Sequence, residues 1–303
     1  MKDHVIQQVG LIGWPVEHSV SPAMHNAAFV ELGLGWQYRL LPTRPGQLGA
    51  RLDKLDQQGF RGVNITVPHK QSIMPHLDRL SETAQAIGAV NTVVFGRQGN
   101  MGDNTDGQGF LDGLRHAGFE PAGQRALVLG AGGGARAVTY ALAQVGCSVT
   151  LYNRTEERAI LMARDMQRLS YKVFVIPADS APWANLDPDR WDLLVNTTPL
   201  GMWPDTQVSP WTDAVPIPPH WTVFDLVYNP SETRLLHQAR QSGAQAIDGL
   251  EMLVRQGALS FKMWTGIQPP IGTMRSAARQ ALDSTKSIPE DQENDHVAFL
   301  DSR

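Results

Sequence analysis

The segment "RALVLGAGGGARAVTYAL", residues 125–142, decides the fold of this 303-residue chain. Its apolar start predicts a buried strand, and the residues that follow its glycines predict a helix. Between them, Gly130, Gly132 and Ala135 have the spacing G-x-G-x-x-A. The first glycine permits a tight turn, the second lets a pyrophosphate approach the backbone, and the small third residue lets helix and strand pack closely. A glycine triplet alone is weak evidence, but this order of elements favours a dinucleotide site over a plain turn.

The end of the next strand indicates which dinucleotide binds. An NAD site usually has an acidic residue there, about 20 residues after the loop, whereas this chain reads "LYNRTEERA". Arg154 stands at that place, Arg158 lies one helical turn further on the same face, and Thr155 is the expected N-cap. Two guanidinium groups can hold a 2′-phosphate, so NADP is the predicted cofactor. The alternative is that both arginines are solvated charges paired with the glutamates beside them.

Strands and helices alternate along most of the chain, which predicts an α/β protein with two domains. Before Gly102 the pattern predicts parallel βαβ units. After it, six candidate strands predict a separate Rossmann-type, doubly wound parallel sheet: residues 125–130, 148–153, 172–177, 192–197, 222–228 and 244–248. Since that sheet is already complete, the helical patterns at 249–266 and near 273–282 are expected to return to the first domain.

The predicted domains are a substrate domain, residues 1–106 and 250–283, and an NADP-binding domain, residues 107–249, with hinges near 103–110 and 248–250. A ligand is expected in the cleft between them. The polar, acidic segment 284–303 is a predicted disordered tail.

Composition argues against several partners. The net charge is −4 and the pI is about 6.1, without a basic run, so nucleic acid is not an expected partner. No stretch approaches the roughly 20 apolar residues that cross a bilayer, and no signal peptide is evident. The single cysteine, Cys147, suits a reducing compartment, so the cytoplasm is the expected location. The assembly is expected to be a monomer or a homodimer.

Polar residues collect near the strand ends of the first domain. In "GVNITVPHK", residues 62–70, Asn64 and Thr66 alternate with apolar residues, and Lys70 follows the strand. The two polar side chains could simply face water, or they could point with Lys70 into a polar site. Further candidates are Ser19 and Ser21 in "WPVEHSVSPAMHN", Asn91 in "GAVNTV" and Asp106 in "GDNTDGQGF".

These motifs, in their order, resemble the shikimate dehydrogenase family, which interconverts shikimate and 3-dehydroshikimate with NADP on the route to aromatic amino acids. The resemblance covers roughly residues 5–283 and extends to "NTTPLGM", "DLVYNP" and "GLEMLVRQGALSF". It implies that Lys70 and Asp106 are the catalytic pair and that Ser19 and Ser21 hold the substrate carboxylate. The substrate-binding residues that it implies are Ser19, Ser21, Asn64, Thr66, Lys70, Asn91, Asp106, Tyr228 and Gln256.

The resemblance also implies a set of cofactor-binding residues. They are Gly130, Ala131, Gly132, Gly133, Gly134 and Ala135 in the loop, Asn153, Arg154, Thr155 and Arg158 after the second strand, and Thr198, Met202, Leu226 and Gly249 nearer the nicotinamide. No metal is expected, because hydride transfer is the chemistry of the cofactor.

Oxidation of an alcohol releases a proton as well as a hydride, so a side chain must take up that proton. A lysine can do so when burial lowers its pKa, whereas a nearby carboxylate opposes that change. Which member of the Lys70–Asp106 pair carries the proton is therefore left open. The histidines near these residues, His18, His25 and His69, are expected to pack or to form hydrogen bonds.

Two other functions are compatible with these motifs. One is a quinate or mixed quinate/shikimate dehydrogenase, although Ser19 with Ser21 fits the shikimate pattern better. The other is a catalytically silent NADP sensor, which the presence of both Lys70 and Asp106 argues against.

Overall fold

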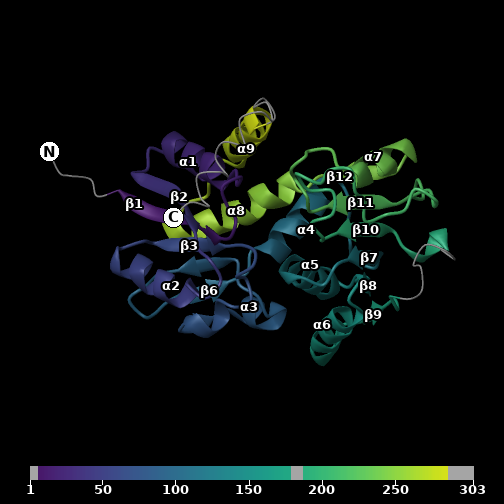
Figure 1. Ribbon diagram of the computed structural model, residues 1–303, viewed down its shortest axis with the longest axis horizontal. Helices are drawn as coiled ribbons and strands as arrows, with labels where there is room; N and C mark the ends of the chain where they lie inside the picture. The colour runs from purple at the N-terminus through teal and green to yellow at the C-terminus, as the bar shows by residue number, and fades with distance from the viewer. Residues whose placement is uncertain (1–5, 179–186, 286–303) are drawn as a thin grey trace, which may run out of the picture.

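The computed structural model describes residues 6–178 and 187–285, and in them it contains two six-stranded sheets. The sheets lie side by side along the long axis of the molecule (Figure 1). This arrangement confirms the predicted two-domain α/β fold. The predicted tail begins within the last helix, which runs to Thr285, and residues 286–303 lie outside the described part of the chain.

The first sheet has the strand order β2-β1-β3-β5-β6-β4. Its elements are β1 (Gln7–Gly13), α1 (Ser21–Glu31), β2 (Trp36–Pro42), α2 (Leu48–Gln57), β3 (Gly62–Ile65), β4 (Arg79–Leu80), α3 (Glu82–Ile87), β5 (Thr92–Val94) and β6 (Met101–Asp103). Strands β1, β2 and β3 are parallel, as predicted. Strand β5, however, is antiparallel to both β3 and β6, so the prediction of uniformly parallel units is wrong here.

Strand β5 reverses direction because it starts beside the end of β3. After β3 the chain passes through the short edge strand β4 and the helix α3, and Val90 N, just before β5, then donates to Lys70 O at 2.7 Å. A strand parallel to β3 would have to begin at the opposite end of β3. Strand β5 therefore runs antiparallel to β3, and Lys70 lies beside its start.

The second sheet has the order β12-β11-β10-β7-β8-β9, and all its strand pairs are parallel. Its elements are β7 (Arg125–Leu129), α5 (Gly133–Gln144), β8 (Ser148–Tyr152), α6 (Glu156–Arg168), β9 (Val173–Val175), β10 (Leu193–Asn196), β11 (Thr222–Asp225), α7 (Arg234–Gln241) and β12 (Gln245–Ile247). The strand order runs outward in both directions from β7, which confirms the predicted doubly wound sheet.

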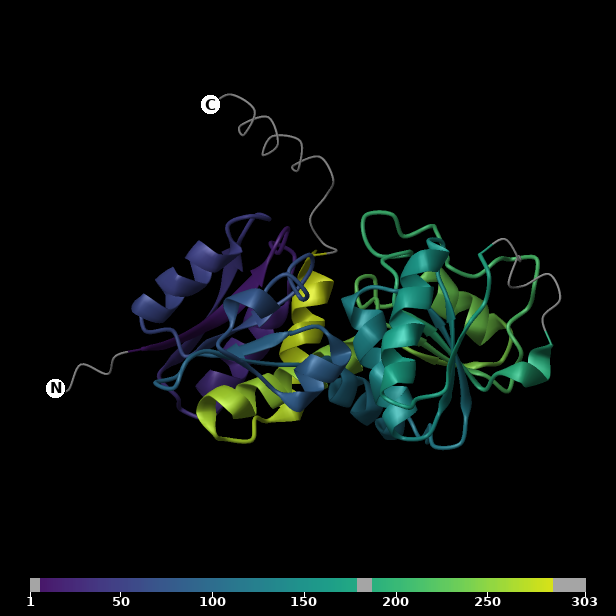
Figure 2. The same ribbon diagram turned by 90° about the horizontal axis from the view of Figure 1, so that it is seen from below.

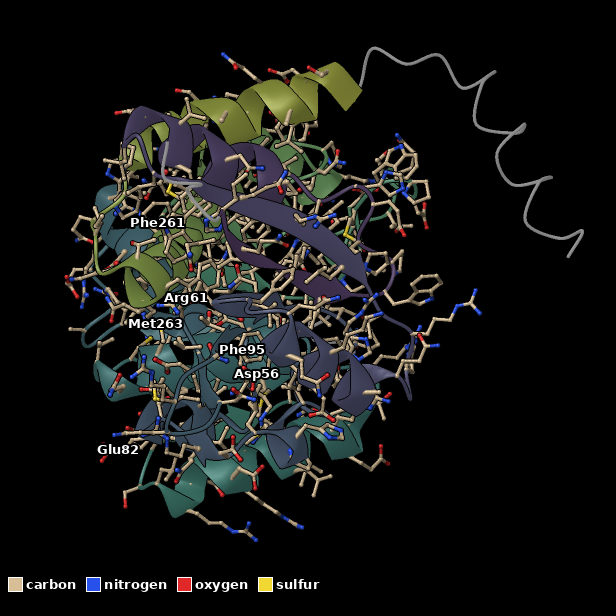
Figure 3. All side chains as sticks on the ribbon, turned by 90° about the vertical axis from the view of Figure 1, so that its left-hand side faces the viewer. Asp56, Arg61, Glu82, Phe95, Phe261 and Met263 are labelled. Atoms are coloured by element: carbon tan, nitrogen blue, oxygen red, sulfur yellow. The ribbon has the colours of Figure 1, made fainter. Side chains whose placement is uncertain are left out.

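Two helices connect the two halves. Helix α4 (Asp106–His116) leads from the first sheet to the second, and α8 (Leu250–Thr265) leads back, after which α9 (Ile271–Thr285) packs on α1 (Figure 2). Residues of α8 and α9 share a hydrophobic cluster with β1 and α1, which confirms the predicted return of these helices. A second cluster joins α2 to the strands; Figure 3 labels Phe261 from the first cluster and Phe95 from the second.

Helix α8 lies very close to the first sheet. The indole nitrogen of Trp264 donates to Val93 O at 3.1 Å. A Cβ atom added at Gly62 would lie 2.2 Å from that nitrogen, so a side chain at this position would push the helix away. The glycine at the start of β3 therefore permits the close contact that brings α8 to the site.

An aromatic cluster around His25 fills the space between α1, β2 and α8. The His25 ring stacks on Tyr38 with centroids 4.3 Å apart and an interplanar angle of 2°, and it also contacts Phe261 and Trp264. Neither ring nitrogen has a hydrogen-bond partner among the described residues, and burial lowers the pKa of His25 to about 3. This histidine packs as a neutral ring, as predicted.

We expect acid to destabilise the protein through His25. Between pH 6.5 and about 3 the unfolded histidine binds a proton that the folded one does not, so stability from this group is lost as the pH falls, by about 1.4 kcal/mol per pH unit. In His25→Leu this contribution is absent. The wild-type minus variant difference in unfolding free energy, measured in urea, should therefore decrease by roughly 2 kcal/mol from pH 7 to pH 5. An equal difference at both pH values would contradict the expectation.

Candidate active site

The glycine loop has the geometry of a dinucleotide-binding turn. Gly130 follows β7 with φ 114°, and a Cβ there would lie 2.4 Å from the Thr197 hydroxyl oxygen, so only glycine fits. Gly132 is the N-cap of α5, and a Cβ at that position would have no atom within 4 Å. Ala135 is fully buried. A backbone open on one side at a helix N-terminus fits a pyrophosphate.

Of the residues expected near the nicotinamide, Thr198 and Met202 follow β10, Leu226 follows β11, and Gly249 is the N-cap of α8. Thr198 is oriented by Asn196, whose Oδ1 accepts from the Thr198 amide at 3.0 Å and from its hydroxyl at 2.7 Å. Asp225 accepts in turn from Asn196 Nδ2 at 2.9 Å, and burial raises the pKa of Asp225 to about 6. The Leu226 side chain lies against Gly134. The buried Asn196–Asp225 pair therefore fixes Thr198, one of the residues expected to contact the cofactor.

The predicted 2′-phosphate residues are exposed at the start of α6. Thr155 is the N-cap residue, as expected, although its side chain makes no capping bond; its carbonyl accepts from Asn153 Nδ2 at 2.7 Å. Within the described residues, neither Arg154 nor Arg158 forms an ion pair. The alternative, in which glutamates neutralise these arginines, thus finds no support, and both guanidinium groups face solvent.

Lys70 and Asp106 form an ion pair with an Nζ–Oδ2 distance of 2.6 Å. Their side chains are 19% and 6% exposed. Asp106 is the first residue of α4, where the helix dipole favours a negative charge, and Lys70 follows β3. A Cβ at Gly133 would lie 3.4 Å from the Lys70 side chain, so this stem lies against the glycine loop. The pair is thus placed beside the dinucleotide loop.

Asn91 holds the carboxylate of this pair. Its Nδ2 atom lies 2.8 Å from Asp106 Oδ1, 2.9 Å from the Thr105 hydroxyl and 3.2 Å from Gln256 Oε1. Its Oδ1 accepts from the Thr105 amide at 2.8 Å and from the Thr92 hydroxyl at 2.9 Å. Both the nitrogen and the oxygen of the Asn91 amide are therefore hydrogen-bonded. These bonds fix the amide, and the fixed amide in turn orients the Asp106 carboxylate.

Asn64 is buried on the face of β3 that Val63 and Ile65 do not occupy, so the alternative in which it simply faces water is excluded. Thr66 follows the strand and is partly exposed. Ser19 and Ser21 lie next to each other, with the Ser19 hydroxyl donating to Ser21 Oγ at 3.1 Å. Tyr228, after the end of β11, lies near Ser19. The structure thus joins five of the predicted residues in one hydrogen-bonded network, namely Asn64, Asn91, Lys70, Asp106 and Gln256, and it pairs Ser19 with Ser21.

Residues that sequence reasoning missed surround this set. Tyr38 donates to Asn64 Oδ1 at 2.8 Å, and Asn64 Nδ2 lies 2.9 Å from Ser260 Oγ on α8. The missed residues are Tyr38, Thr92, Thr105 and Ser260. Each of them occurs in an ordinary strand or helix pattern, so no local sequence pattern marks it as a site residue. Its role becomes evident only from the buried side chain to which it is hydrogen-bonded.

The three histidines have structural contacts. Nε2 of His69 lies 2.7 Å from Thr43 O, and because a carbonyl can only accept, this nitrogen carries the proton. The His18 ring contacts Trp203 at 5.0 Å, which links the two halves of the molecule. In the part of the chain that the structure describes, no group of three potential ligands could hold a metal, and no helix is long and apolar enough to cross a membrane.

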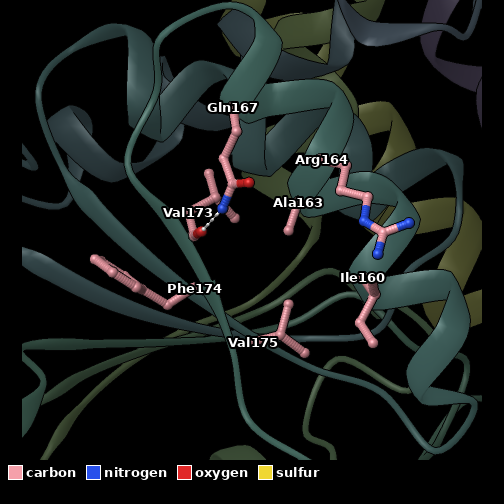
Figure 4. Close-up of a pocket in the computed structure, with 7 residues that line it drawn as sticks. All are labelled: Ile160, Ala163, Arg164, Gln167, Val173, Phe174 and Val175. Atoms are coloured by element: carbon pink, nitrogen blue, oxygen red, sulfur yellow. Dashed lines mark hydrogen bonds between the residues drawn. The ribbon is translucent and has the colours of Figure 1, made fainter.

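Two hollows elsewhere contain none of the predicted site residues. One, of about 300 Å³, lies between α6 and β9 and is mostly apolar; within it Gln167 Nε2 donates to Val173 O at 2.9 Å (Figure 4). The other, of about 480 Å³, lies over β2 and α2. Because no residue of the glycine loop lines either hollow, neither one is the dinucleotide site.

The fold and the site define a dinucleotide-dependent oxidoreductase, with an acid–base pair held beside a nucleotide-binding loop. Family models agree: the shikimate dehydrogenase substrate binding domain matches residues 11–93, and the shikimate 5′-dehydrogenase C-terminal domain matches residues 249–279. A shikimate dehydrogenase (NADP(+)) of Moorella thermoacetica is 45% identical over 93% of this chain and 95% of that protein. The chain belongs to the shikimate dehydrogenase family.

Solved structures show the same likeness. Shikimate 5-dehydrogenase of Thermus thermophilus, crystallised with NADP(H) and shikimate, has a TM-score of 0.82 and 40% identity, over 91% of this chain and 99% of that one. Quinate dehydrogenase of Corynebacterium glutamicum, crystallised with NAD, has a TM-score of 0.81 and 34% identity, over 89% and 98% of the two chains. The fold is therefore shared by enzymes with different substrates and cofactors.

Arg154 should discriminate between the two nicotinamide cofactors. Arg154→Ala is expected to raise the KM for NADP by roughly 10- to 150-fold, because a charge-assisted contact contributes about 1.5 to 3 kcal/mol. The KM for NAD, which lacks the 2′-phosphate, should hardly change. Arg164→Ala, which removes an exposed arginine further along α6, is the matched control and should affect neither. Equal losses for both cofactors in Arg154→Ala would contradict the assignment.

Proposed function

We propose that this protein interconverts shikimate and 3-dehydroshikimate with NADP as the hydride carrier, in the biosynthesis of aromatic amino acids. The observation that carries the proposal is the Lys70–Asp106 pair at 2.6 Å, which lies against the glycine loop at Gly133 and beside a set of buried hydrogen-bonding side chains. A silent sensor would have no use for a buried acid–base pair in this place. The family to which the chain belongs supports the same function.

The two proposed domains bind different ligands. Residues 1–106 with 250–283 bind shikimate, and residues 107–249 bind NADP. On the substrate side, Ser19 and Ser21 donate to the carboxylate, and polar residues at the ends of β3 and β5 contact the ring hydroxyls. The protein acts in the cytoplasm.

Proton transfer is the task of the chain's own side chains. Bound NADPH supplies the hydride for reduction of the ketone. As the carbonyl oxygen becomes negative, Lys70 Nζ donates a hydrogen bond and then a proton to it, and an alcohol results. Asp106 holds the ammonium group in place through its Oδ2 atom, while Asn91 fixes Oδ1. In the oxidation direction the same pair takes up the proton.

The serine pair favours shikimate over quinate. Quinate has an additional hydroxyl on the carbon that bears the carboxylate, so that hydroxyl must fit beside Ser19 and Ser21. These two hydroxyls are hydrogen-bonded to each other, and Tyr228 lies near Ser19, so an additional hydroxyl must compete with polar contacts that are already made. A site filled by hydrogen bonds discriminates strongly against an altered polar group.

Rates with shikimate or quinate, each with NADP or NAD, test this function. We expect kcat/KM for shikimate with NADP to exceed that for quinate with NADP by at least roughly tenfold, and to exceed that for shikimate with NAD. The rates are followed by the absorbance of the reduced nicotinamide. Comparable turnover of both substrates would support a mixed-function enzyme, and the absence of turnover in all four combinations would support the silent sensor.

Lys70→Ala should lower kcat by roughly 10² to 10⁴, the usual range for loss of a general acid or base, with a small change in the KM for shikimate. Asp106→Ala should lower kcat and also raise that KM, because Asp106 is assigned to both catalysis and hydroxyl binding.

The double variant separates a catalytic unit from two independent residues. It should be little worse than the more impaired single variant, because residues that act together are strongly non-additive. If Lys70→Ala keeps its kcat and loses only affinity, Lys70 is a binding residue, and Asp106 or a water molecule carries the proton.

A further inference from the structure

We infer that Tyr38 is a positioning residue of the substrate site, which sets the hydrogen-bonding direction of Asn64. Tyr38 lies on β2, two strands away from β3, and no motif of the sequence marks it. The inference rests on the proposed function, because shikimate binding is the property that it explains.

The orientation of the Asn64 amide follows from its neighbours. Nδ2 lies 3.1 Å from the main-chain carbonyl of Asn91, which can only accept a hydrogen bond. The amide nitrogen must therefore point toward Asn91, and Oδ1 must point toward Tyr38, at 2.8 Å. Since Oδ1 can only accept, the Tyr38 hydroxyl is the donor of this bond.

The donor hydrogens of Asn64 are all used. Besides the Asn91 carbonyl, Nδ2 lies 2.9 Å from Ser260 Oγ and 3.2 Å from Thr92 Oγ1, so two hydrogens face three acceptors. Oδ1 has two lone pairs, of which Tyr38 occupies one. Asn64 can therefore meet a substrate hydroxyl only as an acceptor, through the remaining lone pair. Tyr38 determines which lone pair that is.

Tyr38 also reaches the carboxylate side of the site. Its hydroxyl lies near the Ser21 side chain, which accepts from the Ser19 hydroxyl at 3.1 Å. Tyr38 thus lies between the residues expected to bind the carboxylate and Asn64, which is expected to bind a ring hydroxyl.

The ring of Tyr38 cannot move away from this position. It is 2% exposed, stacks on His25 and contacts Trp264 with centroids 6.1 Å apart. Burial raises the pKa of Tyr38, so its hydroxyl keeps the proton that the bond to Asn64 requires. Because the ring cannot move and the hydroxyl stays protonated, Tyr38 holds the Asn64 amide in one orientation.

Two variants test the inference from opposite sides of Asn64. Tyr38→Phe removes only the hydroxyl, and Ser260→Ala removes the acceptor on α8. Each is expected to raise the KM for shikimate roughly tenfold, whereas kcat and the KM for NADP should stay within about twofold. Loss of packing alone would not produce this selective change. Ser260→Ala decides the question if Tyr38→Phe lowers the melting temperature below that of the assay.

Phe29→Leu is the control, because the ring of Phe29 packs in the same aromatic cluster against His25, Trp36 and Phe261, none of which is assigned to the site. It should lower the melting temperature and leave every kinetic constant within twofold. If the KM for shikimate is unchanged in both Tyr38→Phe and Ser260→Ala while the wild-type enzyme turns shikimate over normally, the inference is overturned and the proposed function stands. Absence of shikimate turnover by the wild-type enzyme would overturn the proposed function and the inference with it. An equal rise of KM in Phe29→Leu would reassign the effect to packing.

Discussion

The crossing of α4 and α8 is the contact on which the site depends. A Cβ at Gly109 would lie 2.7 Å from the main-chain nitrogen of Gln256, so only a glycine allows these helices to touch. Both helices connect the two sheets, and α4 begins at Asp106. Their contact therefore places Asp106 and the polar residues of α8 against the ends of β3 and β5. A bulkier residue at position 109 would separate the halves of the site, although it lies in no binding surface.

Dense hydrogen bonding makes the substrate side rigid. Buried polar groups destabilise a protein unless they are paired, and both Asn64 and Asn91 have partners for all their donor hydrogens. Because each partner is itself bonded, no single side chain can rotate alone. The Lys70 ammonium group has three hydrogens, one of which points to Asp106. The rigid part of the network thus surrounds a lysine that still has hydrogens to donate.

Sequence reasoning succeeded where a function leaves a local pattern. The glycine loop and the parallel strands around it are encoded by spacing and periodicity, and the loop lies where these predict. The antiparallel β5 was missed, because the turn from Lys70 to Val90 depends on a contact and not on a local pattern. Tyr38 and Ser260 were missed for the same reason: each looks like an ordinary core residue until a partner from a distant segment is placed beside it.

The two ligand regions differ in how their specificity is built. The residues expected at the 2′-phosphate, such as Arg154, are exposed and make no contact that the fold requires, so a change there alters the charge of one surface and little else. The residues expected at shikimate are buried in a shared network, where removing one partner leaves another unsatisfied. Cofactor preference can therefore change by single substitutions. A change of substrate requires several coordinated ones, because Asn64 cannot be reoriented unless Tyr38 and Ser260 are altered with it.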